Sequence, residues 1–118
     1  RNGASFSPLP LWGNMLNDTE FQRMADALLT TLSDRLEEAD EAGVLDVELQ
    51  GGVLTLGLPG GKTIVVSRHA PSRQVWVSSP VSGGLHFSYD GAAWMLADGR
   101  ELHGLLAAEV QALSGVCL

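Results

Sequence analysis

The sequence is poor in the residues that form covalent cross-links and metal cages. Its 118 residues include a single cysteine, Cys117, and only three histidines. One cysteine cannot form an internal disulfide, and no CxxC pair or Cys/His spacing typical of a zinc site is present. We therefore expect a protein of a reducing compartment.

Positive charge is also scarce. Seven Lys and Arg stand against fourteen Asp and Glu, which gives a formal net charge of −7 at pH 7. Binding to nucleic acid or to anionic lipid needs a cationic surface, so neither partner is expected. No apolar run approaches the roughly 18 residues of a membrane-spanning helix. With 45% hydrophobic residues the chain can bury a core, and its length suits one domain.

The first sixteen residues differ in composition from the rest. They contain no acidic residue before Asp18, one charge at Arg1, and several prolines, glycines and serines. Such a segment is typical of the tail of an organellar transit peptide, and a disordered leader or a cloning remnant is the alternative. We expect residues 1–16 to form a flexible leader, 17–114 a single domain and 115–118 a short tail.

The remaining chain predicts a helix, a series of short strands and a second helix. Asn17 and Glu20 have the spacing of a capping box, and apolar residues then recur at steps of three and four as far as Gly43. Short β-like segments separated by glycine and proline turns follow, which favours an antiparallel meander. These segments are 44–49, 53–58, 62–67, 74–78, 85–89 and 93–97. A helix over residues 101 to about 113 completes an α+β two-layer sandwich of about six strands, with both helices on one face.

The first predicted helix carries acidic residues on the face opposite its apolar residues. The spacing i, i+3, i+4, i+7 groups four carboxylates, and two more lie on one side of the next strand. We call these six residues the acidic cluster: Asp34, Glu37, Glu38, Glu41, Asp46 and Glu48. Oxygen ligands without His or Cys suit hard cations such as Ca²⁺, Mg²⁺, Mn²⁺ or iron, bound weakly with water completing the shell. A basic partner or a plain solvated face explains the same pattern.

A tryptophan points out of the predicted sheet. In the strictly alternating strand 74–78 the two valines face the core, so Gln74, Trp76 and Ser78 face outward. Tryptophan is the residue most favoured as an anchor at protein interfaces. The alternative is a ring that lies on its own sheet beside other side chains.

Several segments together resemble the frataxin family, in its mitochondrial and bacterial forms. Residues 74–83, QVWVSSPVSG, match the family pattern of Gln, apolar, Trp, apolar, Ser-Ser-Pro, any residue, Ser-Gly. Four further segments are similar to the family in order and spacing: 17–21, 51–55, 90–94 and 103–109. The resemblance covers about residues 16–113 and implies two helices packed on an antiparallel sheet, in agreement with the patterns above.

The resemblance also implies a role in iron–sulfur cluster assembly. Family members bind a complex of cysteine desulfurase and scaffold protein, modulate sulfur transfer, and bind Fe²⁺ and Fe³⁺ weakly through acidic residues. Here the acidic cluster would bind iron or the desulfurase, and Trp76 would rest on the scaffold. His86 would replace in part a basic residue of mitochondrial members, only when protonated. The residues expected to contact partners are Asp34, Glu38, Gln74, Trp76, Ser78 and His86.

Two alternatives to a non-enzymatic regulator stay open. An iron storage or delivery chaperone with weak ferroxidase activity would use the acidic cluster alone, although no buried di-iron constellation is visible. An acidic adaptor with an unrelated partner is the prediction without the resemblance. No Ser, His or Cys stands in the context of a known nucleophile, so no catalytic residue is predicted.

The resemblance also leads to expectations about the cellular location of the protein and its stability. The segments Ser-Ser-Pro and Leu-Leu-Ala-Ala-Glu look like the mitochondrial and related bacterial branch, which with the acid-free leader favours the mitochondrial matrix over the bacterial cytoplasm. We expect a monomer in the absence of metal. In this family the chain after the second helix covers the groove between the helices, and because it is short here we expect modest stability.

Overall fold

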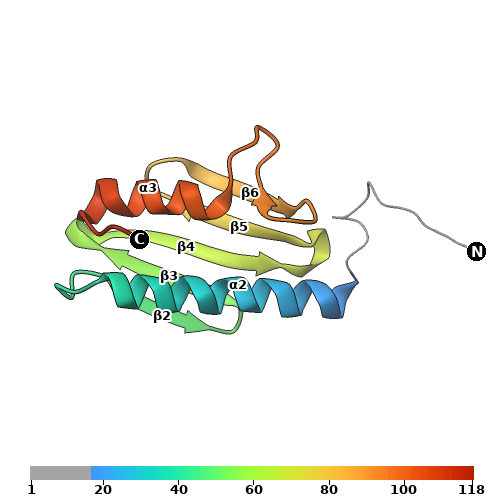
Figure 1. Ribbon diagram of the computed structural model, residues 1–118, viewed down its shortest axis with the longest axis horizontal. Helices are drawn as coiled ribbons and strands as arrows, with labels where there is room; N and C mark the ends of the chain where they lie inside the picture. Colours follow the sequence, from blue (N-terminus) through green and yellow to red (C-terminus); the bar gives the residue numbers. More distant parts are fainter. Residues whose placement is uncertain (1–16) are drawn as a thin grey trace, which may run out of the picture.

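The computed structural model describes residues 17–118, so the predictions for residues 1–16 lie outside the described residues. Helices α2 (Asp18–Ala39) and α3 (Leu102–Ser114) cover one face of a six-stranded antiparallel sheet of order β2-β3-β4-β5-β6-β7 (Figure 1). The strands are β2 (Asp46–Gln50), β3 (Val53–Leu58), β4 (Lys62–His69), β5 (Gln74–Ser79), β6 (Gly83–Tyr89) and β7 (Trp94–Met95). The short 3₁₀ turns are η1 (Pro59–Gly61) and η2 (Ala70–Ser72). The predicted α+β two-layer sandwich with a meander sheet is confirmed.

Helix α2 begins as the sequence predicts. The Asn17 side chain accepts the backbone N–H of Glu20 at 2.8 Å, and the Glu20 carboxylate accepts that of Asn17 at 3.5 Å. This capping box satisfies backbone donors that the first helical turn leaves without partners. Neither helix of the described chain has the length and apolarity needed to cross a membrane.

The core lies between the helix layer and the sheet. Alternate residues of β3, β4 and β5 are buried against α2 and α3, and the aromatic rings of Phe21 and Trp94 meet edge to face at 6.1 Å. Trp94 is 5% exposed, as expected for a core residue. Each large side chain buried in this way contributes about 1.5–3 kcal/mol. The opposite side of the sheet, which we call the open face, has no helix over it in the described chain.

Two predicted elements are shorter than their hydrophobic patterns indicate, because carboxylates capture backbone donors at their ends. Helix α2 stops at Ala39, and the Asp40 side chain accepts the N–H groups of Val44 and Leu45 at 2.8 and 2.9 Å. The strand predicted over 93–97 reduces to β7. The Asp90 carboxylate holds the turn before it, through the backbone N–H groups of Ala92 and Ala93.

The short C-terminal segment lies between the two helices (Figure 1). Gly115 adopts a left-handed conformation with φ 79° and ends α3. Val116 and Leu118 then pack against the core. Together with α2, α3 and the sheet, Leu118 encloses a residual void of only about 10 Å³. Four residues after the helix therefore suffice to cover the apolar groove.

Candidate functional site

The helical part of the acidic cluster is exposed. Asp34, Glu37 and Glu38 project from α2 into solvent. Glu41 lies beyond the helix, because α2 ends at Ala39, and it belongs to the following turn. Within the described residues, none of these four carboxylates forms an ion pair. They are therefore available to a cation or to a basic partner.

The strand part of the acidic cluster points in another direction. In the β2–β3 pairing Asp46 lies opposite Gly57 and Glu48 opposite Thr55, whereas Val47 between them packs against the core. Successive residues of a strand point to opposite faces. Asp46 and Glu48 therefore belong to the open face, on the side of the sheet that α2 does not cover.

The predicted metal ligands thus form two groups on either side of the edge strand β2. In the part of the chain that the structure describes, no three His, Cys, Asp or Glu side chains are grouped closely enough to hold a metal ion. The donor chemistry of exposed carboxylates still suits a hard cation held through one or two oxygens and several waters. Such an arrangement supports weak surface binding rather than a closed site.

Three aromatic rings stack in parallel on the open face. The indole of Trp76 on β5 lies between the imidazoles of His69 on β4 and His86 on β6. The ring centroids are 3.8 and 4.1 Å apart, and both interplanar angles are 13°. We call these three residues the aromatic stack. Both faces of the indole are covered within the chain itself, so a partner would meet three ring edges.

Hydrogen bonds fix the central ring of the aromatic stack. The indole N–H of Trp76 donates to the Gln74 side-chain oxygen at 3.1 Å, and the Gln74 amide donates to the Ser88 hydroxyl at 3.2 Å. Ser78 is exposed farther along the same face. Gln74, Trp76 and Ser78 therefore share the open face, as the alternation predicts, and His86 lies on the same face. His69 was not predicted, because its place beside Trp76 depends on the β4–β5 register.

The second half of the QVWVSSPVSG segment turns inward. The hydroxyls of Ser79 and Ser82 donate to the two carboxylate oxygens of Glu109 on α3, at 2.5 and 2.7 Å. Glu109 is only 7% exposed. These contacts tie the β5–β6 turn to α3 and so support the strand pair that carries the aromatic stack. A single Glu within the apolar run LLAAEV was the available signal for this role.

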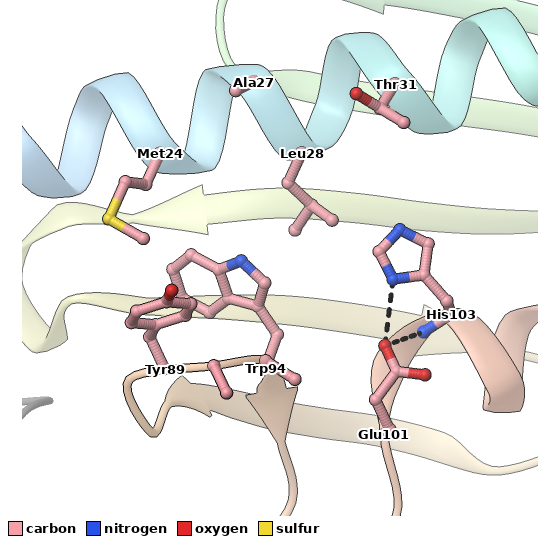
Figure 2. Close-up of a pocket in the computed structure, with 10 residues that line it drawn as sticks. Met24, Ala27, Leu28, Thr31, Tyr89, Trp94, Glu101 and His103 are labelled. Atoms are coloured by element: carbon pink, nitrogen blue, oxygen red, sulfur yellow. Dashed lines mark hydrogen bonds and ion pairs between the residues drawn. The ribbon is translucent and has the colours of Figure 1, made fainter.

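A cleft of about 440 Å³ lies on the helix side of the sheet (Figure 2). Leu28 and Met24 of α2 line it on one side, and Tyr89, Trp94 and His103 line it on the other. Its volume is in the range of small-molecule pockets, but it is wide open and its lining is a mixture of apolar and polar side chains. No residue predicted from the sequence as part of a site lies in it.

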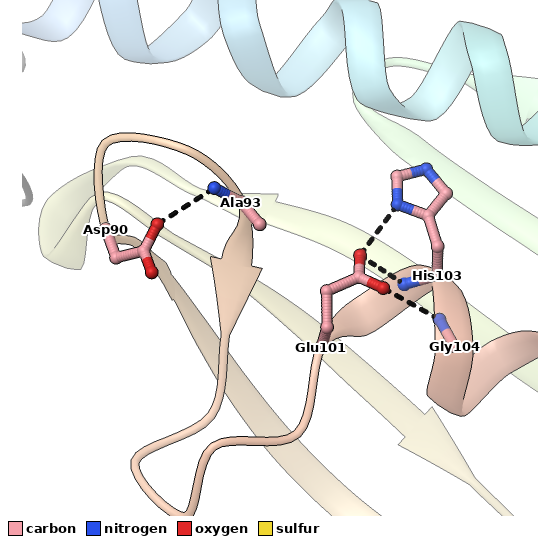
Figure 3. A network of polar contacts seen from close by, with 5 residues as sticks. All are labelled: Asp90, Ala93, Glu101, His103 and Gly104. Atoms are coloured by element: carbon pink, nitrogen blue, oxygen red, sulfur yellow. Dashed lines mark hydrogen bonds and ion pairs between the residues drawn. The ribbon is translucent and has the colours of Figure 1, made fainter.

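Hydrogen bonds at one side of this cleft cap the N-terminus of α3 (Figure 3). The Glu101 carboxylate accepts the backbone N–H groups of His103 and Gly104, at 2.8 and 3.0 Å, and contacts the His103 ring nitrogen Nδ1 at 2.9 Å. Partial burial raises the pKa of Glu101, but these hydrogen bonds outweigh it, so the pKa of Glu101 lies below its ordinary value. Glu101 therefore caps α3, and its carboxylate also contacts the His103 ring.

Comparison with known proteins identifies the family whose fold this chain shares. A family model for the frataxin-like domain matches residues 14–116. Frataxin from Psychromonas ingrahamii is similar, with a TM-score of 0.79 and 27% identity over 87% of this chain and 96% of that one. Yeast frataxin has a TM-score of 0.69 and 34% identity, over 92% of this chain and 91% of that one. A trimeric Saccharomyces cerevisiae frataxin complexed with ferrous iron has a TM-score of 0.63 and 31% identity, over 90% and 96%.

Proposed function

The chain belongs to the family of frataxin-like domains, and from that premise we propose that it regulates iron–sulfur cluster assembly by docking on a cysteine desulfurase–scaffold complex. The observation that carries the proposal is the aromatic stack, which presents Trp76 at the centre of the open face. A fixed aromatic group on a flat sheet surface is a typical anchor of a protein interface. The scaffold protein is the partner proposed for this face.

The acidic cluster supplies a second contact in this proposal. Asp34 and Glu38 on α2 are exposed and available to a basic surface of the desulfurase. Opposite charges arranged across an interface raise the association rate and select the partner. The same carboxylates suit ferrous iron, and the ferrous complex of the yeast trimer supports weak iron binding here.

The test of the docking proposal is Trp76→Ala. Loss of an interface tryptophan typically costs 2 kcal/mol or more, so we expect affinity for the cognate complex to fall at least about thirtyfold. The change in desulfurase activity that the protein causes should fall with it. Calorimetry and a desulfurase assay measure both effects, and far-UV circular dichroism checks the fold.

Val44→Ala is the matched control, because Val44 is an apolar residue in the loop after α2 that is 42% exposed and lies off the open face. It should bind like the unaltered protein. Equal affinity of the Trp76→Ala variant and this control would contradict the proposal.

Iron storage or delivery is the second candidate function, favoured by the structure of trimeric yeast frataxin complexed with ferrous iron. It predicts that Fe²⁺ affinity falls stepwise as residues of the acidic cluster on α2 become Asn or Gln. It also predicts that iron drives assembly of this chain, which light scattering would detect. Calorimetry that shows equal Fe²⁺ affinity after all four α2-side acids are neutralised would exclude it.

A further inference from the structure

The two histidines of the aromatic stack are placed where their charge would matter to a partner. Both imidazoles lie flat against the indole of Trp76, within 4.1 Å between ring centroids. His86 is exposed, and His69 is half-buried with its Nδ1 2.6 Å from the Ser72 hydroxyl. Histidine is the side chain that ordinarily changes charge between pH 5 and 8. A protonated imidazole on an indole face is also stabilised by the ring electrons.

Within the described strands β4, β5 and β6, the open-face positions around the aromatic stack hold no other charged side chain. The open-face neighbours on β4, β5 and β6 are Val65, Ser67, Gln74, Ser78, Gly84 and Ser88. The open-face residues farther away on β3 and β2 include Val53, Thr55 and Gln50. The nearest charged residues on this face of the described sheet are Glu48 and Asp46 at the β2 edge. Among the described residues at the centre of the open face, the two imidazoles are therefore the groups whose ring nitrogens can take up a proton.

This charge pattern restricts the partner. A positive centre fits carboxylates on the opposing surface, whereas the two acids at the β2 edge fit Lys or Arg. A nucleic acid or another polyanion would meet those two acids and a net charge of −7, so it does not fit. The complementary surface is that of a protein with carboxylates facing β5 and β6 and basic residues facing β2.

We infer that the aromatic stack docks against carboxylates of the partner protein, and that protonation of His69 and His86 strengthens this docking as the pH falls. The inference rests on the proposed function, because the cognate desulfurase–scaffold complex is the partner in which these carboxylates are expected. Docking at the open face is then tuned by proton concentration through two rings that also hold Trp76 in place. Above the titration range the same face binds through apolar and hydrogen-bonded contacts alone.

The experiment measures affinity for the cognate complex by calorimetry from pH 8 to pH 6 at constant ionic strength. Two ion pairs at this surface, one at exposed His86 and one at half-buried His69, should tighten binding of the unaltered protein by about fivefold over this range. The double variant His69→Gln/His86→Gln keeps polar side chains without the charge, so its affinity should change less with pH than that of the unaltered protein. The partner's own titration affects both proteins equally, so the difference between them is the result.

His103→Gln is the matched control, because His103 is the third histidine and lies at the cleft on the other side of the sheet. It should keep the pH dependence of the unaltered protein. A ¹H–¹⁵N spectrum of each variant confirms that its fold is intact. Parallel pH profiles for the unaltered protein and the double variant would overturn the inference and leave docking itself standing. Failure of the complex to bind any of these proteins at any pH would overturn the proposed function and the inference together.

Discussion

At the scale of single residues, Glu109 is the one acidic side chain that the described fold buries. Both carboxylate oxygens accept serine hydroxyls, from Ser79 and Ser82. The Ser79 hydroxyl also accepts the backbone N–H of Val81 at 3.0 Å. One carboxylate therefore organises the β5–β6 turn from the far layer of the sandwich, and this explains why a Ser-Ser-Pro-x-Ser turn follows the Trp76 strand.

Glu109→Ala should lower the free energy of unfolding by about 2–3 kcal/mol, because the buried Ser79 hydroxyl and the half-buried Ser82 hydroxyl lose a charged acceptor. Glu109→Gln should cost less, since the amide oxygen still accepts one hydroxyl. Urea unfolding followed by circular dichroism measures both effects, with Gln111→Ala on the exposed side of α3 as the control. A loss below about 0.5 kcal/mol for Glu109→Ala would show that the contacts add nothing to stability.

Two residues of the aromatic stack show which positions the sequence could predict and which it could not. The outward position of Trp76 followed from period-two alternation, because the neighbouring valines had to face the core. His69 had no such signal. It reaches Trp76 only because β4 and β5 pair with His69 opposite Gln74, which places the imidazole diagonally beside the indole. A register between strands depends on turns and packing across the sheet, which a single strand's pattern does not contain.

At the scale of elements, patterns located every helix and strand, and side-chain capture of backbone groups decided where they end. Asp40 and Asp90 accept N–H groups that would otherwise continue α2 or join a longer β7. Side-chain bonds of this kind compete with regular structure at its ends. Hydrophobic periodicity does not detect these side-chain bonds, and for this reason the predicted bounds of α2 and of the strand at β7 ran past the observed ones.

Helix α3 should respond to acid through its cap. Hydrogen bonding keeps the pKa of Glu101 below its ordinary value of 4.5, so its stabilising effect is complete above that value and is lost as the pH falls through the folded-state pKa. Glu101→Gln should therefore be less stable than the unaltered protein near pH 7, by about 1 kcal/mol. That difference should shrink below about pH 4.5.

Urea unfolding at several pH values between 7 and 3 measures the effect of Glu101. Glu37→Gln, an exposed acid on α2, is the control and should follow the unaltered protein. The Asp90 and Asp98 carboxyls also have lowered pKa values, from the backbone N–H groups of Ala93 and Arg100 respectively, so some acid sensitivity should persist in every variant. A Glu101→Gln deficit that stays constant down to pH 3 would contradict this assignment.

At the scale of the whole molecule, the two layers are closed by the C-terminal segment. Leu118 covers Leu32 and Leu36 of α2 and Leu106 and Val110 of α3. Ending the chain at Gly115 should expose this groove and lower the free energy of unfolding by about 2–3 kcal/mol. Thermal and urea unfolding measure the loss. Cys117→Ser is the control, because Cys117 is exposed and its replacement should change little. Equal stability of the shortened and full chains would show that the segment only rests on the groove.

The arrangement of charge also belongs to the whole molecule. The sequence identified six exposed acids, and the fold divides them between the α2 side and the open face. Alternation along β2 predicts that Asp46 and Glu48 lie on the strand face that does not contain Val47, which packs against the core. Because the core lies between the sheet and the helices, this outer face of β2 points away from the helix layer. The sequence pattern of one strand shows which residues face away from the core, but it does not show where that face lies relative to the acidic residues of α2. The single acidic surface predicted from sequence is therefore two surfaces, each available to a different part of a partner.

Docking of the open face on the desulfurase–scaffold complex is tested most directly by the tryptophan indole signals. Trp76 lies on the open face and Trp94 in the core, so one ¹H–¹⁵N spectrum contains both a probe and an internal reference. At substoichiometric amounts of the cognate complex, we predict that the Trp76 indole signal loses intensity well before that of Trp94. Equal loss of both signals, or selective loss at Trp94, would contradict docking through this face.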